Sequence, residues 1–236
     1  MTIAEAVAAV RIHDPKTRCL AQLISERHAK PIKRLLVVGC GSGLEAAALS
    51  QELGCSVIGI DLGSNFDPAA SAIVSLEVGD ATALRFGNGS FDFVYSYHAL
   101  EHIPDYRKAL SEMNRVLANG GGYCVGTPNR SRLIGYLGSK DLTWKEKAQS
   151  NIGDWRDMLK GRFRNEFGAH AGFTGAELSV ALVSAFGHAT DISLDYYRVV
   201  YSRWKSSVQL LQSSGLGKLL FPSVYFVGTK ADRASR

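Results

Sequence analysis

The 236-residue sequence has no apolar run long enough to cross a bilayer as a helix, which takes about 20 residues. Residues 1–15 also lack the basic stretch and long apolar core that mark a secretory signal. The net charge is only +5, and Lys and Arg are scattered among acidic residues, which disfavours nucleic acid as a partner. A mildly basic rim would suit an acidic substrate or a membrane surface. We expect a soluble, cytoplasmic protein with no transmembrane segment.

The sequence also lacks cysteine arrangements that bind metal ions. Its four cysteines, Cys19, Cys40, Cys55 and Cys124, have no C-x-x-C spacing and no histidine pairs of the zinc type. Most of them lie in or beside apolar segments, where reduced and buried thiols are common. No internal repeat is evident, and the length suits a single domain spanning residues 1–236.

Short apolar runs alternate with helical patterns through the first half of the chain. Asp14 followed by Pro15 predicts the start of a helix. We expect strands at 35–38, 56–60, 73–78, 91–97 and 123–127, and helices at 44–53 and 106–118. This alternation predicts an open, mostly parallel α/β sheet.

After Thr127 the alternation lapses and then returns. Residues 128–172 have no strand pattern, and their recurring Trp, Phe and Leu predict a lid of short helices rather than disorder. The run 119–122 (NGGG) is expected to be a break before the fifth strand. Later elements are expected at 175–186 (helix), 190–194 (strand), 203–211 (helix) and 223–228 (strand).

A glycine-rich loop, Gly39–Gly43 (GCGSG), joins the first buried strand to a helix. Glycines there let the backbone approach a ligand closely and adopt angles that side chains forbid. Leu44 stands where a dinucleotide fingerprint has its third glycine, which disfavours a pyrophosphate on the helix N-terminus. The G-x-x-x-x-G-K-[ST] loop of ATPases is absent from the sequence.

Two carboxylates follow the next two strands. Asp61 ends the second strand, where it could accept hydrogen bonds from both hydroxyls of a ribose or cap the turn. Asp80 lies in Gly79-Asp80-Ala81-Thr82 after the third strand, where it could accept from the exocyclic amine of adenine while Ala81 leaves room for the ring. Asp61 alone would also suit an NAD enzyme, whereas the combination is more specific.

These motifs resemble those of class I S-adenosylmethionine-dependent methyltransferases, especially enzymes of quinone biosynthesis, natural products and sugars. Gly89-Ser90-Phe91-Asp92, residues 98–105 (HALEHIPD) and 115–117 (RVL) add to the resemblance, which covers about 35–129 well. It implies a Rossmann-like seven-stranded sheet of order 3-2-1-4-5-7-6 with the last strand antiparallel. It also implies S-adenosyl-L-methionine as cofactor, a cofactor-binding half at 34–129, and lid or acceptor insertions at 130–172 and 196–222.

The resemblance further implies roles for single residues. The loop glycines face the methionine part of the cofactor, Asp61 the ribose, and Asp80 with Ala81 the adenine. The expected cofactor-binding set is Gly39, Cys40, Gly41, Gly43, Asp61, Leu62, Asp80, Ala81, Thr82, Tyr97 and His98.

Polar residues after the fourth strand are candidates for the acceptor side. His102 is predicted to be the general base for a hydroxyl acceptor, unless its role is purely structural. His98 is expected at the methionine end of the cofactor, and Glu101 is expected to be solvated or to orient a neighbour. Asn129 and His170 are further acceptor-side candidates, against a sheet-end cap and a surface-loop histidine. No acidic spacing marks a metal site, so metal dependence stays open.

The aromatic residues beyond Thr127 are expected to form the core of the lid more than to stack on the acceptor: Trp144, Trp155, Phe163, Phe167, Tyr196, Tyr197 and Trp204.

The leading hypothesis is transfer of a methyl group to the hydroxyl of a small molecule: a sugar, a glycolipid, or a quinone or natural-product precursor. N- or C-methylation stays open, because the lid selects the acceptor. Three further classes of protein also stay open: an NAD(P)-dependent oxidoreductase, a nucleic-acid methyltransferase and a non-catalytic binding module. The Asn/Asp-Pro-Pro-Tyr element of nucleic-acid enzymes is replaced here by residues 97–100 (YHAL). The chain could form a homodimer.

Overall fold

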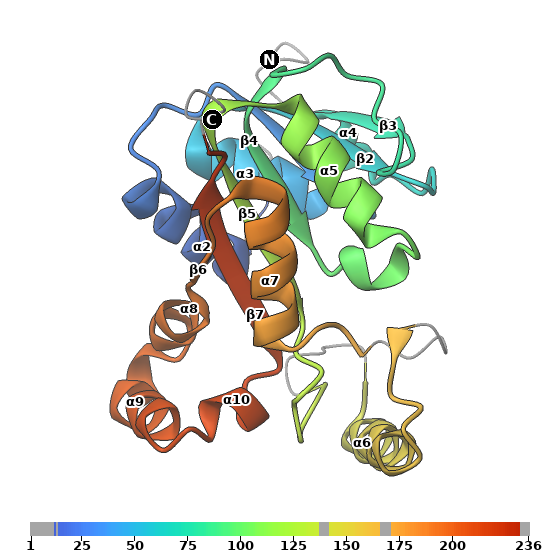
Figure 1. Cartoon of the computed structure of the whole chain (residues 1–236), viewed down its shortest axis with the longest axis vertical. Coiled ribbons are helices and arrows are strands. Elements are labelled where there is room, and N and C mark those ends of the chain that lie inside the picture. The colour runs from blue at the N-terminus through green and yellow to red at the C-terminus, as the bar shows by residue number, and fades with distance from the viewer. Residues whose placement is uncertain (1–11, 13, 137–141, 166–170, 232–236) are drawn as a thin grey trace.

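The structure, a computed structural model, describes residues 12, 14–136, 142–165 and 171–231 and shows one sheet with helices on both faces (Figure 1). The strands are β1 Arg34–Val38, β2 Ser56–Asp61, β3 Ser75–Val78, β4 Phe91–Tyr97, β5 Leu117–Pro128, β6 Thr190–Asp191 and β7 Ser223–Thr229. The helices are α2 Pro15–Arg27, α3 Leu44–Leu53, α4 Pro68–Ser71, η1 Leu100–His102, α5 Tyr106–Val116, α6 Trp144–Leu159, α7 Gly175–Phe186, α8 Ser193–Val200, η3 Ser202–Trp204, α9 Lys205–Ser213 and α10 Gly217–Leu220.

The seven strands have the order β3-β2-β1-β4-β5-β7-β6, which confirms the expected topology. β1 pairs in parallel with both β2 and β4, whereas β7 runs antiparallel to β5 and β6. The chain leaves β1 toward β2 on one side and later returns to place β4 on the other. In open α/β sheets, ligands bind beyond the carboxyl ends of the strands at such a switch point.

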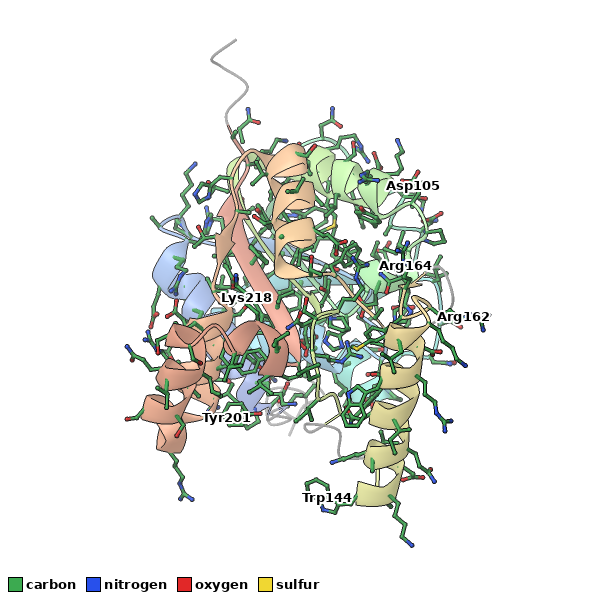
Figure 2. The ribbon with its side chains drawn as sticks, turned by 60° about the horizontal axis from the view of Figure 1, so that its bottom comes forward. Asp105, Trp144, Arg162, Arg164, Tyr201 and Lys218 are labelled. Atoms are coloured by element: carbon green, nitrogen blue, oxygen red, sulfur yellow. The ribbon has the colours of Figure 1, made fainter. Side chains whose placement is uncertain are left out.

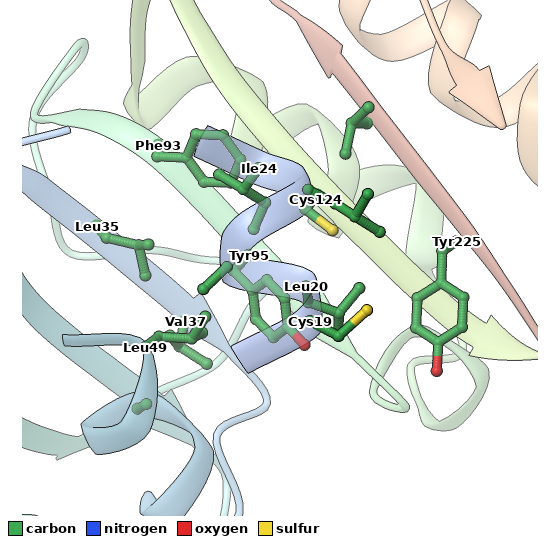
Figure 3. Packing of buried hydrophobic residues seen from close by; sticks show 14 of the residues in the cluster. Cys19, Leu20, Ile24, Leu35, Val37, Leu49, Phe93, Tyr95, Cys124 and Tyr225 are labelled. Carbon is green, nitrogen blue, oxygen red and sulfur yellow. The ribbon is translucent and has the colours of Figure 1, made fainter. Parts of the chain in front are cut away.

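Successive residues of the central strands point to opposite faces and build two cores. Leu35 and Val37 lie in the core that α2, α3 and α8 cover (Figure 3). Leu36 and Val38 lie in the core that α5 and α7 cover. Because both faces are covered, β1 is apolar over its last four residues instead of alternating with polar ones.

The helix predicted at Asp14-Pro15 is confirmed. The Asp14 carboxylate accepts hydrogen bonds from the main-chain N–H groups of Lys16 and Thr17, and Pro15 opens α2. All four cysteines are buried and free.

The expected break at 119–122 is wrong, because the glycine run belongs to β5, and α5 ends at Val116 rather than at 118. Gly122 pairs with Phe93 of β4. A Cβ on Gly122 would lie 2.6 Å from the Phe93 ring and 2.7 Å from His28. Glycine therefore occurs there because neighbouring side chains pack against the strand, not because the strand stops.

The strand expected at 190–194 covers only Thr190–Asp191. The Asp191 carboxylate accepts a hydrogen bond from the Ser193 main-chain N–H at 2.8 Å, and the chain turns into α8. The second helical insertion therefore starts earlier than 203 and brings Tyr196 and Tyr197 into the core.

Residues 142–165 hold one long helix, α6, rather than several short ones. It begins with a capping box between Thr143 and Glu146. Assignment to the lid core is wrong for Trp144, which is 77% exposed, and for Trp155, which is 44% exposed. Phe163, Tyr196 and Tyr197 are buried, and Tyr196 and Tyr197 belong to the core that also contains Leu35 and Val37 of the sheet. Phe167 and the side chain of Trp204 lie outside the described part of the chain.

Within the described ranges, no helix combines the length and the apolar character that a membrane crossing requires.

Gly172 joins the segment before α7 to the end of β5. The main-chain N–H of Phe173 donates to the Pro128 carbonyl, and the Asn165 side chain bonds both main-chain groups of Gly172. Gly172 has a φ of +73°, and a Cβ there would lie 1.9 Å from the Pro128 oxygen. The connection therefore tolerates no side chain.

We expect Gly172→Ala to lower the free energy of unfolding by about 2 kcal/mol or more, because the methyl group meets backbone at a positive φ. Gly153→Ala is the matched control: Gly153 lies within α6, and a Cβ there would meet no atom within 4 Å. This control should gain about 0.5–1 kcal/mol from helix propensity. Urea unfolding of both variants measures the difference, and an unchanged Gly172→Ala would contradict the packing described.

Candidate functional site

The glycine loop is tied to the carboxyl end of β2. Gly39, Gly41 and Gly43 all have positive φ, between +53° and +85°. The main-chain N–H groups of Gly39 and Cys40 donate to the Ile60 carbonyl at 2.9 Å. These bonds fold the loop back over the sheet, where the sequence motifs predict the cofactor.

The Asp61 carboxylate is hydrogen-bonded to the main chain of the glycine loop. Its Oδ2 accepts a hydrogen bond from the Gly41 main-chain N–H at 2.8 Å, and its Oδ1 accepts one from Gly63 at 3.0 Å. Each oxygen keeps lone pairs for a further donor. Leu62, next along the chain, is 74% exposed beside this carboxylate.

Asp80 lies just beyond β3, the strand that pairs with β2 through Asp61 and Val78. Its Oδ1 accepts hydrogen bonds from the main-chain N–H and the hydroxyl of Thr82, both at 2.8 Å. These bonds hold the pKa of Asp80 below its usual value, so the carboxylate is ionised at neutral pH. Ala81 is buried behind it. Two carboxylates thus follow the ends of adjacent strands, as predicted.

The chain after β4 packs directly on the glycine loop. A Cβ on Gly39 would lie only 2.2 Å from the Cβ of Ala99. His98 has a φ of +51°, unusual for a residue other than glycine, and its Nε2 lies 3.1 Å from the hydroxyl of Ser223. The ring of Tyr97 lies 4.0 Å from that of His98. Tyr97 and His98 therefore stand beside the loop.

Tyr97 and His98 also border a cavity of about 510 Å³. His98, Glu101, His102 and Arg132 contribute its polar lining. Its walls are largely aromatic: Tyr97, Tyr136, Tyr196, Tyr197, Tyr201 and Tyr225. We call this space the tyrosine cavity.

The tyrosines of this cavity hold one another in place. The Tyr225 hydroxyl donates to the Tyr97 hydroxyl at 3.1 Å, and their rings stack at 5.5 Å. The Tyr197 hydroxyl bonds both main-chain groups of Ser223. These contacts join β4, α8 and β7 into one rigid wall.

Glu101 is not solvated, contrary to one of the expectations. Its side chain is 1% exposed, and neither carboxylate oxygen accepts a hydrogen bond from another residue of the described ranges. Burial raises its pKa to about 7, against the opposing effects of its own main-chain N–H and the charge of Arg132. The nearest ring nitrogen is Nε2 of His102, at 4.0 Å.

His102 lies at the end of η1, with its side chain 53% exposed. It lines the tyrosine cavity and also a second cavity of about 990 Å³, between η1 and α7. The structure thus brings His98, Glu101 and His102 to one cavity, although their expected roles were separate.

Asn129 is buried, and its side chain is committed to the fold. The amide nitrogen donates to the Lys218 and Phe221 carbonyls at 2.8 Å, and the amide oxygen accepts from Ser131. This geometry favours the sheet-end cap over contact with an acceptor. His170 lies outside the described residues.

Sequence reasoning missed Arg132 as a site residue. Its guanidinium is 5% exposed, donates to the Asn129 and Ala171 carbonyls, and pairs with Asp154 at 3.2 Å. No one-dimensional signal distinguishes it from the exposed basic residues nearby. Tyr225 was missed for a similar reason, because it looks like any apolar residue of a buried strand.

The residues at the loop fit an adenosine joined to an amino acid. A Cβ on Gly41 would meet nothing within 4 Å, so the loop borders free space on that side. Asp61 and Asp80 keep acceptor lone pairs beside the loop, which suit the hydroxyl and amine donors of an adenosine. Among the described residues, no group of three or more His, Cys, Asp or Glu side chains is arranged to hold a metal ion.

Comparison with known proteins agrees with this arrangement. Residues 36–125 match the family described as a methyltransferase domain. Tocopherol O-methyltransferase of Arabidopsis thaliana is 34% identical over 129 residues, covering 51% of this chain and 37% of that protein. Demethylmenaquinone methyltransferase of Staphylococcus aureus is 42% identical over 96 residues, covering 37% of this chain and 40% of that protein. This chain therefore spans less than half the length of either relative.

The fold is also similar to that of a solved structure, phosphoethanolamine N-methyltransferase 2 of Haemonchus contortus in complex with S-adenosyl-L-methionine. The TM-score is 0.54 at 18% identity, over 90% of this chain and 52% of that one. The strand order, the glycine loop and the two carboxylates lie in or beside the part of the chain that the comparisons match. Over residues 36–125 the chain is similar to the methyltransferase domain, and its fold is that of a structure that binds S-adenosyl-L-methionine.

Proposed function

We propose that this chain transfers a methyl group from S-adenosyl-L-methionine to a hydroxyl of a small molecule held in the tyrosine cavity. The observation that carries the proposal is the contact between Gly39 and Ala99. Because of it, His98, which precedes Ala99 in the chain and lines the cavity, is a neighbour of the glycine loop. A donor bound at the loop and an acceptor in the cavity would then be neighbours.

S-adenosyl-L-methionine supplies a methyl group on a positively charged sulfur, which leaves as a neutral thioether when a nucleophile attacks in line. The protein's main task is therefore to align the acceptor oxygen, which by effective-molarity estimates contributes about 7–11 kcal/mol. Gly39, Gly41 and Gly43 would bind the methionine part, with Cys40 behind them. Asp61 and Leu62 would border the ribose, and Asp80, Ala81 and Thr82 the adenine. Tyr97 and His98 would separate this half from the acceptor.

His102 would take the proton of the acceptor hydroxyl as the oxygen attacks. A positioned base of this kind contributes about 10²–10⁴-fold. The Glu101 carboxylate, 4.0 Å from Nε2, would stabilise the protonated ring when it is itself ionised. The proton would then leave through the exposed side of His102.

The aromatic walls support an acceptor with a flat or ring-shaped body, such as a quinone precursor, a natural-product phenol or a sugar. Flat faces of Tyr side chains bind rings of this kind, and their hydroxyls bind polar edges. Two relatives are methyltransferases of tocopherol and of demethylmenaquinone, which agrees with an acceptor of this class. Incubation with radiolabelled S-adenosyl-L-methionine and a panel of catechol, a demethylated quinol and a methyl glucoside tests the proposal directly.

We expect Asp61→Ala to weaken binding of S-adenosyl-L-homocysteine at least tenfold, because hydrogen bonds to a charged group contribute about 1.5–3 kcal/mol. Asp92→Ala is the matched control, since Asp92 also accepts two main-chain hydrogen bonds, from Lys33 and Arg34, but at the start of β4. Calorimetry should show normal affinity in the control. Equal losses in both variants would mean that Asp61 acts only through stability.

We expect His102→Ala to keep its affinity for S-adenosyl-L-homocysteine and to lose about 10²–10⁴-fold in turnover. His188→Ala is the control, because His188 is exposed on the loop before β6, away from the cavity. Methyl transfer to the best acceptor of the panel is the measurement. Turnover in His102→Ala that matches the unmodified protein would eliminate the base role.

Glu101 generates a prediction about stability and pH. Its pKa is about 7 in the folded protein, above the usual value of 4.5, so the folded state favours the protonated form. The contribution of protonated Glu101 to the stability of the folded state is therefore complete below about pH 4.5 and is lost as the pH rises through 7. Relative to the unmodified protein, Glu101→Gln should gain about 2–3 kcal/mol of unfolding free energy between pH 4.5 and pH 8.

Burial also raises the pKa of Glu45 to about 7, so the stability of either protein alone depends on pH through Glu45 as well. The difference in unfolding free energy between the two proteins cancels this contribution and isolates that of Glu101. Glu112→Gln provides a control of opposite sign, since hydrogen bonds from Arg115 lower the pKa of Glu112. That variant should lose most stability at neutral pH and little in acid. A pH-independent effect of Glu101→Gln would be inconsistent with a buried carboxylate whose pKa is raised by burial.

A further inference from the structure

Helix α6 carries an apolar stripe that faces solvent. Trp144, Ala148, Ile152, Trp155 and Leu159 follow one another at intervals of three or four residues, so they lie on one side of the helix. All five are exposed, Leu159 to 89%. No residue of α6 is buried. Most of this stripe therefore faces solvent.

The polar side of the same helix faces the protein. The Asn151 side chain bonds both main-chain groups of Gly135, and Asp154 pairs with Arg132. An ordinary surface helix buries its apolar side and exposes its polar one. The hydrogen bonds of Asn151 and the ion pair of Asp154 hold α6 in this reversed orientation.

The apolar surface continues from α6 through Leu133 to helices α9 and α10, which we call the α9–α10 arm. The Trp155 indole N–H donates to the Leu133 carbonyl at 2.6 Å, and the Leu133 N–H donates to the Leu219 carbonyl at 2.7 Å. Leu133 and Leu219 are themselves exposed. We call the resulting surface the apolar end and define it by Leu133, Trp144, Ile152, Trp155, Leu159 and Leu219.

Figure 1 places helix α6 and helices α9 and α10 at the same end of the molecule. α6 and the α9–α10 arm both project beyond the carboxyl ends of β4 and β5, on either side of the centre (Figure 1). In the turned view, Trp144 lies at the outer end of α6, with Lys218 on the opposite arm (Figure 2). Residues 133–135 form hydrogen bonds with both α6 and the α9–α10 arm. Arg132 and Tyr136, on either side of this segment in the sequence, line the tyrosine cavity.

Basic residues rim the apolar end. The stretch 143–164 holds six basic residues and three acidic ones. Two of the acidic ones are engaged, Glu146 in the capping box and Asp154 with Arg132. Lys145, Arg156, Lys160, Arg162 and Arg164 are all exposed, and none forms an ion pair with a residue of the described ranges.

We propose that the apolar end docks on the surface of an anionic lipid bilayer. Trp and Leu side chains on one side of a helix, bordered by Lys and Arg, are the chemistry by which helices lie in the headgroup region. Each basic residue near anionic lipid adds attraction. A second copy of this chain fits the same surface less well, because a two-fold interface would bring the basic rims together.

The docked surface places the tyrosine cavity next to the membrane. Leu133, which hydrogen-bonds to both Trp155 and Leu219 of the apolar end, is adjacent in sequence to the cavity residue Arg132. An amphiphilic acceptor could thus enter from the bilayer without crossing water. Docking itself is independent of the proposed methyl transfer and is measured without turnover.

The test is sedimentation of the full chain with large vesicles of two compositions, phosphatidylcholine alone and an equal mixture with phosphatidylglycerol. We expect binding to the mixture, weakening with salt, and a blue shift of tryptophan fluorescence. Leu159→Glu should lower the partition coefficient about tenfold or more, because it removes an apolar contact and adds a negative charge. The double variant Arg162→Glu with Arg164→Glu should have a similar effect.

Val183→Glu is the matched control, since Val183 is an exposed apolar residue on α7, outside the apolar end. It should bind vesicles normally. Circular dichroism and S-adenosyl-L-homocysteine binding confirm that each variant is folded. Equal binding by Leu159→Glu and the control, or equal binding to neutral and anionic vesicles, would overturn the proposal. A third outcome would also overturn the proposal: the unmodified chain forms a dimer, binds no vesicles, and is dissociated by Leu159→Glu. The apolar end would then join two copies of the chain.

Discussion

The close packing of Gly39 on Ala99 is the contact on which the arrangement of the site depends. A side chain at residue 39 would stand 2.2 Å from the Ala99 Cβ, so the loop after β1 and the segment after β4 meet only because glycine is there. Hydrogen bonds from the loop to Asp61 and to the Ile60 carbonyl hold it in this position. The glycine loop and the residues Tyr97 and His98, which line the tyrosine cavity, are consequently neighbours. The methyl transfer proposed above depends on this backbone packing.

Burial of charge shapes the tyrosine cavity. Arg132 and Asp154 compensate each other, and Arg132 satisfies two carbonyls as well. Neither oxygen of Glu101 accepts a hydrogen bond from another described residue, and burial raises its pKa to about 7 although the charge of Arg132 opposes this. A carboxyl group with a pKa near neutrality, beside a half-exposed histidine, makes the ionisation of this part of the site sensitive to small changes in its surroundings.

Helix α6 shows how tertiary contacts can turn the apolar side of a helix toward solvent. The spacing of Trp144, Ile152 and Leu159 is that of a helix with one apolar side, which ordinarily predicts a side turned to the core. The structure turns it outward because Asn151 and Asp154, on the other side, find polar partners in Gly135 and Arg132. Periodicity reveals that a helix is amphipathic but does not say which side the rest of the protein will cover.

The sequence by itself determined the sheet, the glycine loop and the two carboxylates after β2 and β3, because each depends on short-range patterns. Buried runs such as 35–38 and glycines that need positive φ can be recognised locally. It did not determine that residues 119–122 continue β5, since the reason lies in the Phe93 ring and in His28, distant in sequence. Nor could it place Glu101 out of solvent, or bring Tyr97, Tyr197 and Tyr225 together. Those outcomes depend on which elements cover which, and only the tertiary structure decides that.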